Sequence, residues 1–326
     1  MKKIVVFFAF IFIFSSCSLN LPEQNIKRSE YMLGTFINLN IYDSDVGEDV
    51  VDNCFELVSQ YEKMFSYYDS SSELYQLNQN AYKHPFKVTD EMYDIITESL
   101  DYCRKTDGAF DIGLGKVIEI WDDASGEGIP PDEALLSPFA GFRGYEHIVV
   151  NEIDKTVYFS DERVSIHLGA CAKGFVQDKA VTFLKECGVK SALLDFGGSI
   201  YALGTKDSKP FSIGITDPTS ESELAGTVQI TDLSVVTSGN YRRFFEYNGV
   251  VYHHIIDSAT AFPSQSDING VSVICESAFK GDCLSTASFV LGAERAEALL
   301  SDENCGYVII TDESVRSDGV IFKNEK

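Results

Sequence analysis

The sequence predicts an α+β fold, in which helices and strands are mixed along the chain and hairpins are prominent. Two observations favour this class. Short runs of β-branched and aromatic residues are bounded by turn-forming residues, and longer segments repeat apolar residues at helical spacing. The chain has 326 residues, of which 44% are hydrophobic and 23% charged, so it can bury a large core.

The predicted strands begin after residue 30. Residues 31–42 carry β-branched and aromatic residues around Gly34-Thr35, and we expect a strand or one arm of a hairpin there. Residues 147–150 and 156–160 are expected to form a hairpin. The remaining strand signals cover residues 192–194, 211–215, 227–230, 250–256, 271–275 and 307–311.

Four segments are predicted to be helical. Residues 50–65 place their apolar side chains on one face, and residues 90–103 form a second helix with Thr89 or Asp90 as its cap. Residues 173–187 form a third. The fourth starts near Cys283 and runs to about residue 301, with Gly292 as a candidate interruption. Residues 121–144 contain several glycines and prolines and are predicted to be loop-rich.

The N-terminus has the pattern of an export signal. Met1-Lys2-Lys3 is a short basic start, and residues 4–14 form an apolar run that is too short to span a bilayer. Small residues then precede Cys17, as in a bacterial lipobox, which predicts cleavage before Cys17 and a lipid on its sulfur. The alternative is an ordinary secretory signal with a coincidental cysteine. We expect a signal peptide over 1–17, a polar tether over 18–29, a globular domain over 30–322, and an extracytoplasmic, lipid-anchored protein.

The charge balance and the cysteines argue against several function classes. The net charge of −24 argues against binding to nucleic acid, because phosphate backbones are held by Lys and Arg. An anionic ligand would need a metal ion, a helix N-terminus or a single lysine; the excess acid otherwise only keeps an exported protein soluble. The cysteines after Cys17 form no CxxC pair and no Cys/His cluster. Zinc is therefore not indicated, and the spacing favours buried thiols over a disulfide framework.

Two local matches do not carry the function that they spell. Asp195-Phe196-Gly197 lacks the accompanying loops of a kinase, and residues 113–116 lack the spacing of a P-loop. The sequence contains no GxGxxG after a first strand and no GxSxG. These absences argue against a Rossmann-type dinucleotide fold and an α/β-hydrolase.

Two segments suit the binding of a phosphate or another ligand by backbone. Residues 167–175 place small residues ahead of a helix, where backbone amides favour a phosphate and Lys173 would add positive charge. The alternative is a tight turn with a solvated lysine. Residues 195–199 contain Gly197-Gly198, which either permits close approach of a ligand or forms a plain turn.

Two further segments suit a base and a cation site. His254 ends an apolar strand near a carboxylate-bearing turn, where it either acts as a general base or makes a structural hydrogen bond. Asp282, Ser285 and Thr286 lie within one helical turn, so their oxygens can converge on a hard cation such as magnesium. In the alternative, Asp282 caps the start of a helix.

Taken in order, these segments resemble the ApbE family, the FAD:protein FMN transferases. The resemblance runs from about Tyr31 to Leu291, and each motif is weak alone while the ordered series is specific. The matching motifs lie at residues 33–35, 65–68 with 72–74 and 77–78, 108–111, 168–174, 197–198, 237–239, 254–257 and 282–286.

The resemblance implies a T-fold-like α+β body with two antiparallel sheet layers and packed helices. It also implies a magnesium site formed by Asp282, Ser285, Thr286 and the carbonyl of Ala170. Aromatic side chains such as Tyr68 and Phe110 are expected to pack against the flavin or the adenine. The positions where the family contacts FAD are Leu33, Tyr68, Ala109, Phe110, Asp111, His167, Lys173 and Ile256.

The chain departs from the family pattern at some of these positions. Leu33 stands where methionine is usual, and His167 replaces an aspartate. A neutral histidine accepts a hydrogen bond from a nucleotide less well than a carboxylate, so FAD affinity or its pH dependence is expected to differ. The residues expected to carry the chemistry are retained: His254, Asp282 and Thr286.

The implied reaction is magnesium-dependent transfer of FMN from FAD to a Thr or Ser hydroxyl of an acceptor protein, with release of AMP. The implied catalytic residues are His254, as the base, and Asp282. The implied acceptors are flavin-carrying subunits of membrane redox complexes of the Rnf or sodium-pumping quinone reductase type. Two alternatives stay open: an FAD pyrophosphatase that gives FMN and AMP, and a non-catalytic flavin-binding lipoprotein.

Overall fold

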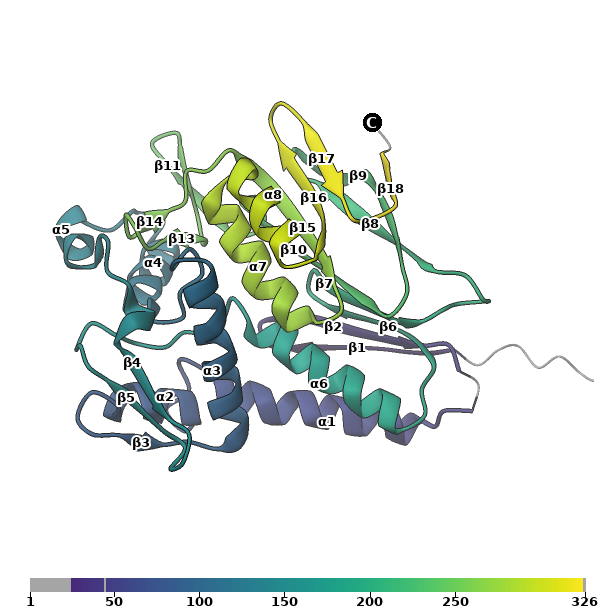
Figure 1. Ribbon diagram of the computed structural model, residues 1–326, viewed down its shortest axis with the longest axis horizontal. Coiled ribbons are helices and arrows are strands. Elements are labelled where there is room, and N and C mark those ends of the chain that lie inside the picture. The colour runs from purple at the N-terminus through teal and green to yellow at the C-terminus, as the bar shows by residue number, and fades with distance from the viewer. Residues whose placement is uncertain (1–24, 44, 325–326) are drawn as a thin grey trace, which may run out of the picture.

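The centre of the molecule is an eight-stranded antiparallel sheet. In the computed structural model, which describes residues 25–43 and 45–324, the strand order is β1-β2-β6-β7-β10-β15-β16-β17 (Figure 1). The strands are β1 (Ile26–Met32), β2 (Thr35–Ile41), β6 (Ser191–Phe196), β7 (Ser199–Gly204), β10 (Leu233–Gly239), β15 (Ile268–Cys275), β16 (Gly306–Thr311) and β17 (Val315–Asp318).

A three-stranded sheet covers one face of the central sheet. It consists of β8 (Phe211–Asp217), β9 (Ser220–Ile230) and β18 (Phe322–Asn324), in the order β18-β9-β8. Because side chains alternate between the two faces of a strand, one set from each sheet meets in a shared core. This core includes Ala202, Val235, Ile274 and Val308 from the central sheet and Ile213, Ile215 and Val228 from the smaller one.

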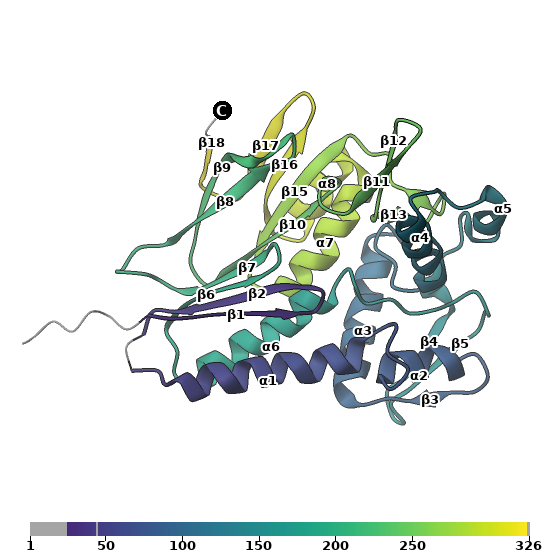
Figure 2. The ribbon, with the colours of Figure 1, turned by 180° about the vertical axis from the view of Figure 1, so that it is seen from behind.

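Helices cover the opposite face of the central sheet (Figure 2). α1 is amphipathic and buries residues such as Val51 and Val58 on one side. α7 is buried on nearly all sides, because it lies among the sheet, α3, α6 and α8. The helices of this layer are α1 (Glu48–Phe65), α3 (Asp90–Lys105), α6 (Ala172–Glu186), α7 (Ala278–Leu291) and α8 (Ala293–Asp302).

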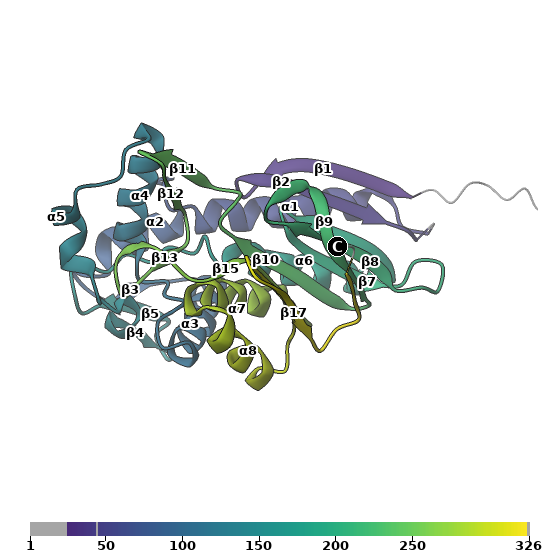
Figure 3. The same cartoon turned by 90° about the horizontal axis from the view of Figure 1, so that it is seen from above.

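Shorter elements gather at one end of the molecule, away from the three-stranded sheet (Figure 3). The β11–β12 and β13–β14 hairpins pack against α4 around Trp121, whose indole N–H donates to the Ala261 carbonyl at 2.9 Å. The elements here are α2 (Glu73–Asn80), α4 (Gly115–Glu127), α5 (Glu133–Leu136), β3 (Phe86–Lys87), β4 (Ile148–Asn151), β5 (Thr156–Phe159), β11 (Phe244–Tyr247), β12 (Val250–His253), β13 (Ile256–Asp257) and β14 (Phe262–Pro263).

The α+β prediction is confirmed, but the structure contains three helices that the sequence patterns did not predict. α2 is an addition, α4 occupies the first part of the segment expected to be loop-rich, residues 121–144, and the short α5 lies inside that segment. The buried residues Val117, Trp121 and Ala124 of α4 follow helical spacing, so a signal was present. The helix ends at Gly128, whose φ of 68° is typical of a glycine C-cap. Gly128 therefore marks the end of a helix, in a segment where the glycines and prolines had predicted a loop.

The strand expected over residues 250–256 is divided. β12 ends at His253 and β13 begins at Ile256. The division arises because the two segments pair with different partners, β11 and β14. His254 therefore lies in the connection between two small hairpins.

The helix expected from Cys283 begins earlier, at Ala278. Ser277 is its N-cap, since the Ser277 side chain accepts a hydrogen bond from the backbone N–H of Lys280. Asp282 is therefore inside α7, and the alternative that it caps the helix is wrong. Gly292, with φ of 81°, separates α7 from α8 at the expected interruption.

The N-terminal predictions fall mostly outside the described residues. The expected signal peptide and Cys17 lie there, as does the first part of the expected tether. Residues 26–29 of the expected tether belong to β1, whose Ile26 is buried, and β18 continues past residue 322 to Asn324. Strands therefore extend beyond residues 30–322 at both ends. Over the part of the chain that the structure describes, the helices lack the length and apolar character needed to cross a membrane.

Candidate active site

Asp282 lies where α6 and α7 approach each other closely. A Cβ atom added at Gly174 of α6 would come within 2.3 Å of the Ala278 carbonyl oxygen, so only glycine permits this approach. At the crossing, the Gly174 N–H donates to Oδ2 of Asp282 at 2.6 Å. This N–H belongs to the first turn of α6 and has no acceptor within its own helix. The Asp282 carboxylate of α7 therefore acts as a capping group for the N-terminus of α6.

The Asp282 carboxyl group is almost fully buried. Burial raises its pKa to about 6, while the nearby Lys173 ammonium and the Gly174 N–H act in the opposite direction. The bond from Gly174 engages Oδ2, which leaves Oδ1 for a second partner. Since a buried carboxylate is costly unless it is paired, this position suits a cation ligand.

Ser285 and Thr286 follow Asp282 by about one turn of α7. The buried Ser285 hydroxyl lies 3.2 Å from the Asp282 carbonyl oxygen and accepts a hydrogen bond from Ser238, at the end of β10, at 2.9 Å. Thr286 and Ala170 are half-buried. In the described part of the chain, His, Cys, Asp and Glu do not gather in groups of three that could hold a metal. Hydroxyl and carbonyl oxygens would complete the site around one carboxylate, and such hard oxygen donors fit magnesium.

His254 directly follows β12 and is exposed to solvent on one side. Its backbone N–H donates to the Arg243 carbonyl at 3.2 Å, and its Nδ1 lies 3.3 Å from the same oxygen. Donation from Nδ1 leaves Nε2 as the free acceptor. Protein atoms crowd the rest of the ring, and this desolvation, with the positive charge of Arg243, lowers the pKa of His254. The ring is therefore neutral at neutral pH, as a general base requires.

Two cations stand near the histidines of the site. Burial is the main cause of the lowered pKa of both His167 and His254, and the charges of Lys173 and Arg243 add to it. Lys173 also favours the ionised form of Asp282. One lysine therefore acts on the predicted metal ligand and on the predicted base. Arg243 was not among the predicted site residues; its contact with His254, through the Arg243 carbonyl oxygen, is visible only in the folded chain.

His167 and Tyr68 flank Tyr67. The His167 and Tyr67 rings lie 5.0 Å apart, and His167 Nδ1 accepts a hydrogen bond from the Gly169 N–H at 3.2 Å. Burial lowers the pKa of His167 to about 4, so this ring is also neutral. The Tyr68 hydroxyl donates to Asp122 at 2.6 Å, while 59% of the Tyr68 residue surface stays exposed. Tyr68 is thus free to stack on a planar ligand.

The segment from Ala109 to Asp111 is mostly buried. Asp111 Oδ1 accepts the N–H groups of Gly113 and Tyr145 at 2.7 and 2.9 Å, and Oδ2 has no partner among the described residues. Burial raises the pKa of Asp111 to about 7. The Phe110 ring is only 1% exposed and belongs to the core, so the expectation that it packs against flavin or adenine is wrong. Its backbone, and the half-buried Ala109, remain the parts that can face a ligand.

Leu33 occupies the turn between β1 and β2 with φ of 53°, and its N–H donates to Glu62 at 2.7 Å. A Cβ atom added at the next residue, Gly34, would lie 4.0 Å from the Arg243 guanidinium, so the turn borders the His254 side of the site. Ile256 is half-buried at the start of β13.

Backbone contacts tie the remaining segments to this group. The His167 N–H donates to the Ile112 carbonyl at 2.9 Å, which places the 109–111 segment beside the segment that leads into α6. The Ser258 hydroxyl donates to the Gly108 carbonyl at 2.9 Å, which joins the same segment to the one after His254. The fold thus brings the predicted residues, which are spread from Leu33 to Thr286, around one locality.

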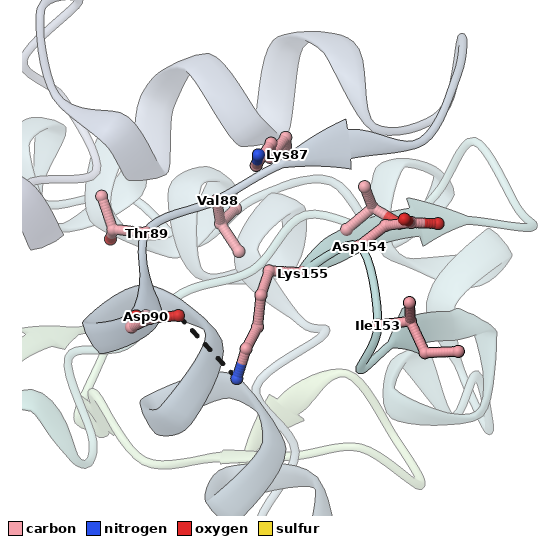
Figure 4. A pocket seen from close by; sticks show the side chains of 8 residues that line it. Lys87, Val88, Thr89, Asp90, Ile153, Asp154 and Lys155 are labelled. Atoms are coloured by element: carbon pink, nitrogen blue, oxygen red, sulfur yellow. Dashed lines mark ion pairs between the residues drawn. The ribbon is translucent and has the colours of Figure 1, made fainter.

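A shallow depression of about 530 Å³ lies elsewhere (Figure 4). Residues 87–90 and 153–156 line it, and Lys155 pairs with Asp90 at 3.8 Å across it. None of the predicted site residues is part of its lining. We therefore define the site by the contacts described above and not by this hollow.

Comparison with known proteins decides the family. A sequence model described as the ApbE family matches residues 33–309. The chain belongs to the ApbE family. This membership and the α+β fold confirm the two broadest expectations from the sequence.

Relatives in this family are enzymes. The FAD:protein FMN transferase of Treponema pallidum (strain Nichols) is 33% identical over 305 residues, which cover 88% of this chain and 84% of the relative. The FAD:protein FMN transferase of Klebsiella pneumoniae (strain 342) is 28% identical over 285 residues, covering 87% and 88%.

Solved ApbE structures share the fold over nearly the whole chain. The ApbE protein of Thermotoga maritima superposes with a TM-score of 0.81 at 25% identity, covering 92% of this chain and 97% of that one. A histidine-to-glycine variant of the flavin transferase ApbE of Vibrio cholerae gives a TM-score of 0.79 at 25% identity, covering 90% and 97%.

Proposed function

We propose that this protein is a magnesium-dependent FAD:protein FMN transferase, which attaches FMN to a Thr or Ser hydroxyl of an acceptor protein and releases AMP. Its family and the names of its relatives support flavin transfer. The observation that carries the finer proposal is the Asp282 carboxylate, which is buried at the α6–α7 crossing and accepts a hydrogen bond from the Gly174 N–H at 2.6 Å. Lys173, the residue before Gly174, favours the ionised form of this carboxylate, and Arg243 contacts His254, in a chain of net charge −24.

Asp282, Ser285, Thr286 and the Ala170 carbonyl would hold the magnesium ion. The buried Asp282 carboxylate supplies the negative charge, and the α6–α7 crossing orients it through the Gly174 N–H. When bound, magnesium would neutralise charge on the pyrophosphate oxygens. Lys173 and Arg243 add positive charge that the chain itself supplies.

His254 is the proposed base. Its neutral ring takes the proton of the acceptor hydroxyl at Nε2 while that oxygen forms a bond to the FMN phosphorus. The bond from this phosphorus to the oxygen of the AMP group breaks, and AMP leaves with the electron pair. General-base catalysis of this kind typically contributes roughly 10²–10⁴-fold to the rate.

Tyr68, Leu33, His167, Asp111, Ile256 and the backbone of 109–110 are the proposed contacts for FAD. The exposed Tyr68 ring suits stacking, and the unpartnered Oδ2 of Asp111 suits a hydrogen-bond donor of the ligand. His167 is neutral and accepts through Nδ1 from Gly169, so it offers Nε2–H as a donor where a carboxylate would only accept.

We further propose an extracytoplasmic location, with a lipid on Cys17 as the anchor. The acceptors would be flavin-carrying subunits of membrane redox complexes of the Rnf or sodium-pumping quinone reductase type. The support is the basic start, the apolar run and the small residues before Cys17, together with the resemblance to the family.

Hydrolysis of FAD to FMN and AMP is the second candidate. It is favoured by the solvent exposure of His254, which leaves water able to reach the base. Magnesium and the same residues would serve both reactions.

The test incubates the protein with FAD, magnesium and a candidate acceptor subunit, followed by a denaturing gel under ultraviolet light and an assay of AMP. A fluorescent acceptor band with an equal amount of AMP is the expected result, and chelation of magnesium should remove both. AMP without a band, across several acceptors, would indicate the hydrolase. Bound FAD without either product would indicate a flavin-binding protein and contradict the proposal.

A further inference from the structure

Two cysteines face each other at one end of the central sheet. β15 and β16 pair antiparallel, and the last pair of their ladder is Ile274 with Gly306. Cys275 and Cys305 are the next residues outward, so the register places them directly opposite each other. Opposed residues in an antiparallel pair have Cα atoms about 4.5–5.5 Å apart, which falls within the range of about 4.4–6.8 Å found in disulfides.

The surroundings of the two thiols differ. The Cys275 thiol donates to the Ser277 carbonyl oxygen at 3.0 Å and the Cys305 thiol lies 3.6 Å from the Glu303 carbonyl oxygen. The neighbouring Cys275 thiol and the charge of Lys280 lower the pKa of Cys305 against the effects of burial and of Glu303. Lys280 is held in place by Glu303, whose carbonyl oxygen accepts from its Nζ at 2.6 Å and whose carboxylate pairs with it at 3.2 Å. Because the thiolate is the nucleophile in thiol–disulfide exchange, Cys305 is the attacking member of the pair.

We propose that Cys275 and Cys305 form an intramolecular disulfide by exchange with an external disulfide of the glutathione type. The Cys305 thiolate attacks one sulfur of the oxidant, forms a mixed disulfide and expels one thiolate. Cys275 then loses its proton to solvent, attacks the Cys305 sulfur and expels the second thiolate. The two electrons lost by the cysteines reduce the oxidant to two thiols, so the step balances.

A second thiol pair provides an internal comparison. The thiols of Cys171, at the start of α6, and Cys283, in α7, also influence each other, since Cys171 raises the pKa of Cys283, but both residues are 0% exposed. Cys275 and Cys305 retain 7% and 6% exposure at the sheet end. An external disulfide is therefore expected to react with Cys275 and Cys305 before it reacts with Cys171 and Cys283. Cys187 is exposed and reports whether the oxidant is active.

The cross-link would close a loop that contains both α7 and α8. This loop includes Asp282, Ser285 and Thr286, and Cys275 lies two residues before the N-cap Ser277. A cross-link restricts the unfolded chain, so the oxidised protein is expected to unfold at a midpoint several degrees higher than the reduced protein.

The experiment equilibrates the purified protein with oxidised and reduced glutathione at set ratios. Free thiols are then trapped with N-ethylmaleimide under denaturing conditions, and peptides are identified by mass spectrometry. We expect a linked Cys275–Cys305 peptide, lighter by two hydrogens than the reduced pair, at ratios where Cys171 and Cys283 are still alkylated. The thermal midpoint should rise in parallel with the linked fraction.

Matched variants separate the link from general oxidation. Cys305→Ser and, independently, Cys275→Ser should remove the linked peptide and the rise in midpoint, while Cys187→Ser should leave both unchanged. The thermal midpoint of each variant is first measured in the reduced state, to show that the variant folds. If only one of Cys275→Ser and Cys305→Ser folds, that variant alone is enough for the test. The proposal is overturned if Cys275 and Cys305 stay free where Cys187 is fully glutathionylated, or if Cys305 carries glutathione that Cys275 does not displace.

Discussion

The two sides of the candidate site are built in different ways. Asp282 and Ser285 are buried between helices whose approach depends on Gly174, so core packing sets their positions. His254 and Arg243 lie exposed at the base of the β11–β12 hairpin. The difference teaches that a substitution on the first side alters both chemistry and stability, whereas one on the second side should alter chemistry almost alone.

The packing of the hairpin explains why its side of the site is more independent. β11 and β12 pair only with each other, and their main anchor is aromatic. Tyr252 stacks between Trp121 of α4 and Phe245, with ring centroids 5.6 and 5.3 Å away. Phe244 and Val250 of the same hairpin are exposed and do not anchor it to the core. The central core is thus largely insulated from changes at His254.

The largest effect is expected from Asp282→Asn. This variant keeps an oxygen for the Gly174 N–H but removes the charge, so we expect activity to fall roughly 10³-fold or more, as for loss of a metal-ion contribution of several kcal/mol. AMP release at saturating FAD, titrated with magnesium, measures it. Asp282→Ala should in addition lower stability by about 1–3 kcal/mol, because a buried N–H loses its acceptor. Full turnover of Asp282→Asn at ordinary magnesium would refute the metal assignment.

His254→Gln is expected to lower kcat by roughly 10²–10⁴-fold, the usual contribution of a general base. Because the side chain is exposed, the free energy of unfolding should stay within about 0.5 kcal/mol of the parent. Single-turnover rates with acceptor, together with FAD affinity, separate chemistry from binding. An unchanged kcat with weakened FAD binding would assign His254 to ligand contact instead.

Gly174→Ala tests the buried side through packing. The added Cβ meets the Ala278 carbonyl, so α6 and α7 must separate at a cost of about 1–3 kcal/mol of unfolding free energy. Chemical denaturation measures this change. Gly126→Ala is the control, since its Cβ would meet nothing within 4 Å in α4 and alanine favours a helix by up to about 1 kcal/mol. Equal stability of the two variants would remove the close-approach argument.

Arg243→Gln is expected to raise the KM for FAD about tenfold, as for loss of a charge-assisted contact to a phosphate, with little change in stability. The neighbouring Arg242→Gln provides the comparison, because the Arg242 guanidinium is already bonded to the Gly197 carbonyl at 3.2 Å. A similar KM in both variants would show that Arg243 has no special role.

The prediction furthest from the chemistry concerns the pH dependence of stability at Asp111. Its folded-state pKa of about 7 lies above the ordinary value of 3.8, so the folded protein holds a proton that the unfolded chain has lost. Stability therefore falls as the pH rises from about 4 to 7. Asp111→Asn keeps an oxygen for Gly113 and Tyr145 and does not titrate. Its free energy of unfolding relative to that of the parent should therefore increase by roughly 2–3 kcal/mol from pH 5 to pH 8, since one pKa unit corresponds to about 1.4 kcal/mol. Urea unfolding at both pH values measures it, and a constant difference would contradict the burial argument.

Local patterns in the sequence determined much of this protein. The helical spacing in α1 is visible because only one face is buried, so apolar and polar residues alternate with a clear period. Asp282, Ser285 and Thr286 are neighbours on one turn wherever the helix packs, so their grouping follows from sequence alone. The order of the short motifs was sufficient to indicate the family, and the comparison bears it out.

Other features required the tertiary structure. α7 begins five residues before its predicted start because it is buried on nearly all sides, and a segment without a polar face shows no period to mark its limits. Phe110 and Tyr68 are both aromatic residues in matching motifs, yet one ring is in the core and the other is exposed. Residue type alone cannot distinguish these two environments.

The contacts that define the site join residues far apart along the chain. The Gly174 N–H and the Asp282 carboxylate are 108 positions apart, and the charge of Lys173 acts on both Asp282 and His254, which are distant from it along the chain. Sequence spacing describes neighbours within a turn of helix or along a strand. The burial that raises the pKa of Asp282 and lowers that of His254 depends on how distant segments exclude water together, and only the folded chain decides it.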